Sequence, residues 1–179
     1  MFRARGDVAR VSALLGDWTK ADGLYATTPR DEAERSFVWF LRARLAMWRS
    51  DAAWAASARK QMTEPSFPLA SVVDAICDGI VNRSAPEPVL QVIESMGKVT
   101  GRVRRRPIFF RQLRAEVLAH AGDAQGALAA IEEAAQLGLI DLVWLDRCPL
   151  FVGLREIPSF LAARAVVNER ASRVLEAFT

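Results

Sequence analysis

The sequence predicts an all-α protein, an α-solenoid of helix–turn–helix hairpins that is closed by a C-terminal capping helix. Apolar residues recur at steps of three and four, the spacing that marks one face of a helix. Small residues recur every 36 positions, at Ala43, Gly79 and Ala115. No segment shows the alternation of apolar and polar residues that is typical of strands.

Composition indicates a globular chain that stays out of the membrane. Half of the 179 residues are hydrophobic and 25% are charged, which is the balance of one folded domain over residues 1–179. Charges interrupt the apolar stretches before they reach the roughly 20 residues that span a bilayer. The chain begins without the apolar core of a secretory signal and holds two cysteines, too few for a disulfide framework. We therefore expect a cytoplasmic protein.

The hairpin over residues 105–138 has the strongest pattern. Two amphipathic helices are joined by Ala121-Gly122-Asp123. Asp123 is predicted to cap the second helix, and Gly138 to end it in a left-handed conformation. The apolar stripe of the second helix comprises Ala127, Leu128, Ile131, Ala134 and Ala135. This segment predicts a closely packed helical pair.

Three earlier hairpins are predicted over residues 2–28, 31–64 and 69–97. The first has a turn at Gly16-Asp17, and in the second Asp51 precedes two alanines much as Asp123 does. In the third, Ser84-Ala85-Pro86-Glu87 predicts a capping box with a first-turn proline, although Gln91 stands where a small residue is expected. An irregular helical bundle whose spacing is accidental remains the alternative.

The tail is predicted to close the array with two further helices. Asp141 caps a short helix over 141–147, whose Trp144 and Leu145 fill the gap behind the last hairpin. Pro158 opens a capping helix over 158–178. Its apolar face comprises Phe160, Ala163, Val167, Ala171, Val174 and Phe178. A dimerising or membrane-surface helix is the alternative reading of this segment.

The run from Ala115 to Leu118 and from Gly122 to Ala134 resembles a tetratricopeptide repeat (TPR). The tail, Gly138 to Pro149 and then Leu154 to Phe160, resembles the segment that closes such arrays in bacterial signalling proteins, namely serine/threonine kinases and transcriptional regulators. The resemblance implies a regulatory or scaffolding module that binds a protein partner, and it carries no catalytic residue.

In TPR arrays ligands usually lie on the concave face formed by the first helices of the hairpins. Transferred to this chain, that face comprises Arg10, Phe37, Phe40, Arg44, Met47, Trp48, Ile76, Ile80, Arg83, Gln112, Glu116 and His120. Aromatic side chains surrounded by arginines suit a helix or an extended peptide with acidic residues. The alternative is that Phe37, Phe40 and Trp48 belong to the core.

A basic run gives a second functional hypothesis, binding of nucleic acid or another polyanion. It comprises Arg102, Arg104, Arg105 and Arg106, and Arg111 and Arg114 follow it. Two observations weigh against this reading. Charge runs in loops are usually only solvated, and the helical spacing of Phe109 and Phe110 favours packing over base stacking.

Catalysis has little support in the sequence. His120, the single histidine, is predicted at a helix end, and Cys77 lies two repeats away from it. The neighbouring Glu132 and Glu133 point apart on a helix. Zinc-ligand spacing and phosphate-binding loops are missing from the sequence, so we expect no metal, no cofactor and no enzymatic activity. An enzyme that depends on His120 or Cys77 is the third hypothesis.

Overall fold

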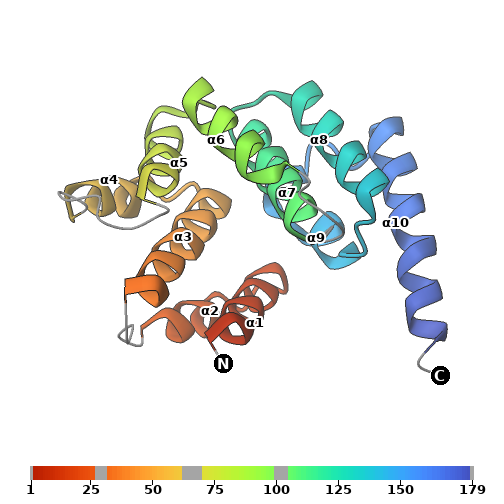
Figure 1. Ribbon diagram of the computed structural model, residues 1–179, viewed down its shortest axis with the longest axis horizontal. Coiled ribbons are helices and arrows are strands. Elements are labelled where there is room, and N and C mark those ends of the chain that lie inside the picture. The colour runs from red at the N-terminus through yellow and green to blue at the C-terminus, as the bar shows by residue number, and fades with distance from the viewer. Residues whose placement is uncertain (1, 27–31, 62–69, 99–104, 178–179) are drawn as a thin grey trace. The chain divides into compact units, whose positions relative to one another are not determined.

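The computed structural model describes residues 2–26, 32–61, 70–98 and 105–177, and within these ranges every regular element is helical (Figure 1). The predicted all-α class is therefore confirmed for the described residues. The helices are α1 (Phe2–Leu14), α2 (Trp18–Tyr25), α3 (Glu32–Arg49), α4 (Ala52–Gln61), α5 (Ala70–Asn82), α6 (Glu87–Gly97), α7 (Arg105–His120), α8 (Ala124–Leu137), α9 (Leu142–Arg147), the 3₁₀ turn η1 (Pro149–Phe151) and α10 (Pro158–Glu176).

The chain divides into two compact units, residues 1–84 with α1–α5 and residues 85–179 with α6–α10. In the first unit α1 packs on α2 and α3, and α5 packs on α3 and α4. In the second, α7 lies between α6 and α8, and α10 packs on α8 and α9. The division falls between α5 and α6, so the hairpin over 69–97 stays a prediction.

One turn geometry recurs three times, after α1, α3 and α7. Each helix ends at a residue with a left-handed φ: 87° at Gly16, 53° at Ser50 and 85° at Gly122. The aspartate that follows donates its backbone N–H to the carbonyl five residues back, at 2.9 Å in all three turns. Its carboxylate then accepts the N–H three residues ahead, at 3.0, 2.9 and 2.9 Å. Each turn thus ends one helix with a Schellman motif and starts the next with an aspartate cap.

Buried alanines stand at matching positions on both sides of these turns. In each case the alanine of the second helix follows that of the first by 12 residues, and all six are fully buried. A methyl side chain lets two helix backbones approach more closely than a larger residue would. The three pairs are Ala9 with Ala21, Ala43 with Ala55, and Ala115 with Ala127.

The segment between α5 and α6 departs from this geometry. Arg83 has a left-handed φ of 48° and the Ser84 N–H bonds to the Gly79 carbonyl at 3.1 Å, but no aspartate follows. The capping box predicted for Ser84–Glu87 is wrong. Pro86 is the N-cap of α6 and no side chain caps it, because the helix begins at Glu87 with Pro88 in its first turn.

The end of α8 and the short helix α9 form as the sequence indicates. Gly138 ends α8 with a φ of 110°. The Asp141 carboxylate accepts the backbone N–H of Trp144 at 3.1 Å and so caps α9. Trp144 and Leu145 are fully buried, and the Trp144 ring meets Phe151 edge to face with centroids 4.9 Å apart. This aromatic pair fills the space between α7 and α10.

Helix α10 covers the second unit with only part of the predicted apolar face. Phe160, Ala163 and Val167 are buried. Val174 is 40% exposed, and Phe178 lies outside the described residues. Only Phe160, Ala163 and Val167 of the predicted face therefore cover the interior. The later part of α10 extends past the end of α8, the helix on which α10 packs.

Arg170 marks the place where this packing stops. Its Nη1 donates to the backbone carbonyl oxygens of Ala135 and Leu139, both at 2.8 Å. The Ala135 carbonyl lies in the last turn of α8 and also accepts the Gly138 N–H at 3.2 Å, and the Leu139 carbonyl lies just beyond the helix. The Arg170 guanidinium thus binds the C-terminal end of α8 and links α10 to it.

Candidate functional site

Most residues predicted to form a concave binding face lie in the interior. Phe40, Arg44, Met47, Trp48, Ile76, Ile80, Gln112 and Glu116 are all buried. Arg10, Phe37 and His120 are half-buried, and Arg83 is exposed. For Phe40 and Trp48 the structure shows the alternative, core packing. These buried side chains pack between helices and so stabilise the fold.

Glu116 and Gln112 bind the tail of their own chain. The Glu116 carboxylate, fully buried, accepts a hydrogen bond of 2.6 Å from the indole Nε1 of Trp144 on α9. One turn earlier on α7, Gln112 Nε2 donates to Asp141 Oδ2 at 3.4 Å. The polar face of α7 is therefore covered by α9 and its capping residue, which makes both residues unsuitable contacts for a partner.

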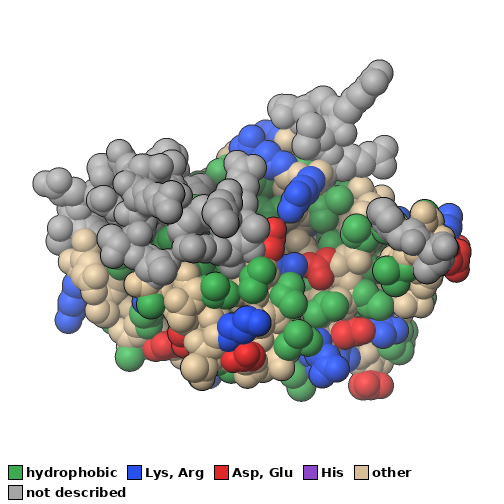
Figure 2. All heavy atoms as spheres, turned by 90° about the horizontal axis from the view of Figure 1, so that it is seen from below, with side chains coloured by type: hydrophobic (Ala, Val, Ile, Leu, Met, Phe, Trp, Pro, Cys, Tyr) green, Lys and Arg blue, Asp and Glu red, His purple; other side chains and the backbone are tan. Residues whose placement is uncertain are grey.

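The basic run is not a continuous patch among the described residues. Arg102 and Arg104 lie outside them. Arg105 and Arg106 are exposed in the first turn of α7, where the helix dipole disfavours positive charge. The guanidinium of Arg106 lies 5.9 Å from the ring centroid of Phe110. Figure 2 shows basic and acidic side chains interspersed with apolar ones over the described part of one face.

Arg111 joins three helices through ion pairs. From α7 it donates to both carboxylate oxygens of Glu94 on α6, at 2.5 and 3.0 Å, and its Nε lies 2.6 Å from Glu133 Oε2 on α8. Arg114 Nη1 reaches the same Glu94 at 3.2 Å. Hydrogen bonding from Arg111 holds the pKa of Glu94 below its usual range. Both arginines following the basic run are thus occupied within the protein.

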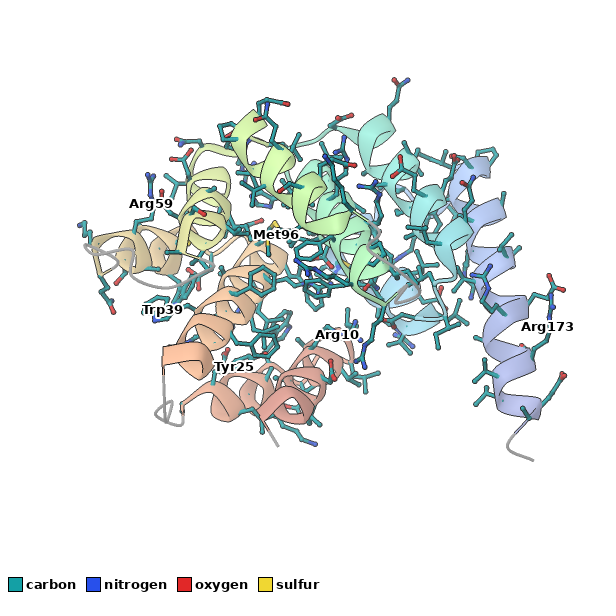
Figure 3. The ribbon with its side chains drawn as sticks, viewed as in Figure 1. Arg10, Tyr25, Trp39, Arg59, Met96 and Arg173 are labelled. Atoms are coloured by element: carbon teal, nitrogen blue, oxygen red, sulfur yellow. The ribbon has the colours of Figure 1, made fainter. Side chains whose placement is uncertain are left out.

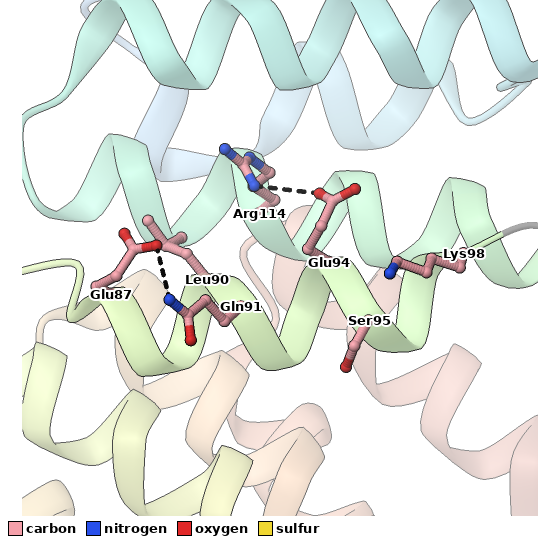
Figure 4. Close-up of a pocket in the computed structure, with 7 residues that line it drawn as sticks. All are labelled: Glu87, Leu90, Gln91, Glu94, Ser95, Lys98 and Arg114. Carbon is pink, nitrogen blue, oxygen red and sulfur yellow. Dashed lines mark hydrogen bonds and ion pairs between the residues drawn. The ribbon is translucent and has the colours of Figure 1, made fainter.

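A groove of about 310 Å³ runs along α6 beside α7 in the second unit (Figure 4). Its lining consists of Glu87, Leu90, Gln91, Glu94, Ser95, Lys98 and Arg114. The five residues from α6 and its C-cap residue Lys98 repeat at steps of three and four and so form one face of the helix. We call this site the α6–α7 groove.

The groove is open and polar, and hydrogen bonds within its lining and a close helix contact fix its shape. Gln91 Nε2 donates to Glu87 Oε1 at 3.2 Å, and Arg114 closes on Glu94 in the middle (Figure 4). At Gly97 the helices approach so closely that a Cβ there would lie 3.1 Å from Cβ of Phe110. Sequence reasoning missed this site, although the polar stripe at helical spacing was a readable signal. The hairpin around this stripe matches the repeat pattern poorly, so the repeat does not single it out.

A smaller groove of about 190 Å³ lies between α8 and α10. It is lined largely by alanines and Val166, with Glu132, Gln136 and Ser159 around them. Three of its seven lining residues are polar, against six of seven in the α6–α7 groove, so it offers fewer polar groups to a specific ligand.

The residues considered for catalysis are not arranged for it. Burial raises the pKa of the Cys77 thiol to about 12, so the reactive thiolate is scarce at neutral pH. Cys77 lies on α5 and His120 ends α7, in different units. Among residues 2–26, 32–61, 70–98 and 105–177, no group of three or more His, Cys, Asp or Glu side chains could hold a metal ion.

No helix in the described ranges is both long and apolar enough to cross a bilayer.

Comparison of the chain with known protein families, with curated proteins and with solved structures found no match.

Proposed function

We propose that this chain is a TPR-like helical-repeat module that holds a segment of another protein. The observation that carries the proposal is the recurrence of one turn, with a left-handed residue, an aspartate cap and a pair of buried alanines, after α1, α3 and α7. Stacked helical hairpins of this kind expose long grooves along their helices, and such grooves bind peptides in many repeat proteins. The resemblance of the tail to the ends of bacterial signalling proteins supports a regulatory role.

The α6–α7 groove is the proposed binding site. Gln91 and Ser95 are exposed and offer both donors and acceptors to a peptide backbone. Glu87 and Lys98 place opposite charges at the two ends of the groove, which can fix the direction in which a peptide lies. The buried residues of the predicted concave face cannot contact a peptide unless the helices that cover them separate.

Site-specific photo-crosslinking tests this proposal. A photoreactive amino acid replaces Gln91 in the groove, and in a control protein it replaces Gln125, an exposed residue in the first turn of α8. We expect a discrete crosslinked protein from position 91 in native-host extract and none from position 125. A Ser95→Arg substitution should weaken that crosslink by at least about tenfold through steric block and added charge. Equal crosslinking from both positions would contradict the assignment of the groove.

A further inference from the structure

The two ends of the α6–α7 groove carry opposite charges that no ion pair neutralises within the described residues. Glu87, in the first turn of α6, accepts a hydrogen bond of 3.2 Å from the uncharged Gln91, and none of the described cations pairs with it. Lys98, the C-cap residue of α6, makes no ion pair with any described carboxylate. Both side chains are exposed. Each can therefore pair with a charged group of a bound segment.

The charges around the Lys98 end of the groove do not cancel. Arg111, Arg114 and Lys98 all act electrostatically on Glu94, and Arg111 also pairs with Glu133. Three cations and two carboxylates leave this group with a net charge of +1. Arg114 bonds to Glu94 through Nη1 at 3.2 Å, and its other N–H groups make no hydrogen bond to a described residue. A carboxylate of a partner is the complementary group at this end.

The lining between the charged ends favours an extended segment over a helix. Charges of these signs also suit the two ends of any helix, so the site depends on what lies between them. Leu90 is the one apolar residue of the seven that line the groove, whereas a docked amphipathic helix needs apolar surface along its length. Gln91 and Ser95 donate to Glu87 and to the Val92 carbonyl, which leaves Oε1 and Oγ to accept. Only an extended backbone has N–H groups to spare for them.

The length of α6 sets the spacing of charges in such a segment. Lys98 follows Glu87 by 11 residues, which is about 16 Å at the rise of an α-helix. An extended chain advances about 3.3 Å per residue with alternating side chains, so residues four apart lie on one side at a separation of about 13 Å. Long basic and acidic side chains cover the small difference. Two charges at this spacing can reach both ends of the groove.

We propose that the α6–α7 groove binds an extended segment of a partner protein with a basic and an acidic residue about four positions apart. The basic side chain pairs with Glu87 and the acidic one with Lys98, while the backbone between them donates to Gln91 and Ser95. This inference rests on the proposed function and adds to it the charge pattern by which the groove recognises its partner.

Fluorescence anisotropy on the whole chain tests the charge pattern with four capped, dye-labelled peptides of serine and alanine. They differ only at two positions four residues apart, which hold Arg and Glu, Arg and Arg, Glu and Glu, or Gln and Gln. We expect the wild type to bind the Arg and Glu peptide about three- to tenfold more tightly than the Gln and Gln peptide, because two exposed ion pairs form. Added salt should reduce that preference.

Charge reversal in the groove should change which peptide is preferred. Lys98→Glu leaves two acidic ends and should favour the Arg and Arg peptide, and Glu87→Lys should favour the Glu and Glu peptide. Glu169→Lys is the matched control, because Glu169 pairs with the exposed Arg173 on the outer side of α10, away from the groove (Figure 3). This variant should keep the order of preference of the wild type.

Equal binding of the four peptides, binding of none of them, or one order of preference in the wild type and both groove variants would overturn the charge pattern. The photo-crosslink from position 91 then separates the two levels of the argument. A discrete crosslink would show that the groove holds a partner without this pattern, so that only the present inference fails. Absence of the crosslink as well would mean that the groove itself is wrongly assigned.

Discussion

The environment of Glu116 shows how one residue can change its role once the chain has folded. Its position on the first helix of a hairpin, one residue after Ala115, predicts a side chain that faces a ligand. In the structure its carboxylate is fully buried and accepts a 2.6 Å hydrogen bond from the Trp144 indole. A buried carboxylate is costly unless it is well bonded, so this contact favours the one arrangement in which α9 covers α7.

Replacing Trp144 with phenylalanine tests that contact. The variant keeps an aromatic ring next to Phe151 but removes the N–H that Glu116 accepts, and we expect the free energy of unfolding to fall by about 2–3 kcal/mol. Denaturant unfolding followed by circular dichroism measures it. Trp18→Phe, at a half-buried ring, should change stability by less than about 1 kcal/mol. Similar losses in the two variants would show that the hydrogen bond contributes little.

Most of the predicted helix caps form, although the box at Ser84–Glu87 does not, whereas the sequence does not predict the burial of polar side chains on the helix faces. Asp123, Gly138, Asp141 and Pro158 act where the sequence placed them, because capping and helix initiation depend on a few neighbouring residues. Glu116 and Arg44 are buried because distant segments cover them, and nothing near them in the sequence records that. A polar residue on a helix face therefore does not by itself predict an exposed side chain. Its exposure also depends on which other helices cover that face.

At the scale of helices, Arg111 links α6, α7 and α8 through Glu94 and Glu133. In the folded protein the pKa of Glu94 lies below its ordinary value of 4.5. The stability that the Arg111–Glu94 ion pair contributes is therefore fully present above pH 4.5. It is lost as pH falls through the lowered pKa of the folded state. Acid should thus weaken the attachment of α6 to α7.

The Glu94→Gln variant tests this linkage. We expect its free energy of unfolding to fall less than that of the wild type between pH 6 and about pH 3, because it lacks the carboxylate that must be protonated. Urea unfolding at several pH values gives the comparison. Glu169→Gln is the control, since the Glu169–Arg173 pair is about two-thirds exposed and contributes little. Parallel pH profiles for Glu94→Gln and the wild type would contradict the expectation.

Helix α10 should contribute stability through its first half alone. Phe160 is 1% exposed and its ring meets Phe151, so Phe160→Ala should cost about 3–5 kcal/mol. Val174 lies on the same predicted stripe but is 40% exposed, and Val174→Ala should change stability by less than about 0.5 kcal/mol. Thermal and denaturant unfolding of the two variants will separate these cases. A large loss in Val174→Ala would mean that the end of α10 is covered in solution.

At the scale of the whole molecule, the chain divides into two compact units, residues 1–84 and residues 85–179. Residues 85–179 enclose Leu113, Ile131, Trp144, Phe151 and Phe160, while the buried residues of 1–84 come from α1–α5. The sequence predicts one continuous array because the spacing of small residues runs through Gly79. The turn after α5 lacks the aspartate of the other three, and it is there that the division falls.

Residues 85–179 should therefore fold when they are expressed alone. Of the five tryptophans in the chain only Trp144 belongs to this segment, so its fluorescence reports on that core without interference. We expect a helical circular-dichroism spectrum, cooperative urea unfolding, and Trp144 emission that is shifted to short wavelength and shielded from acrylamide, because the indole is fully buried against Phe151. Introducing Phe160→Ala into the fragment should abolish or strongly weaken the transition, since it removes the contact that closes this interior. A fragment with solvent-exposed Trp144 emission and no cooperative transition would show that residues 1–84 are needed to complete the core.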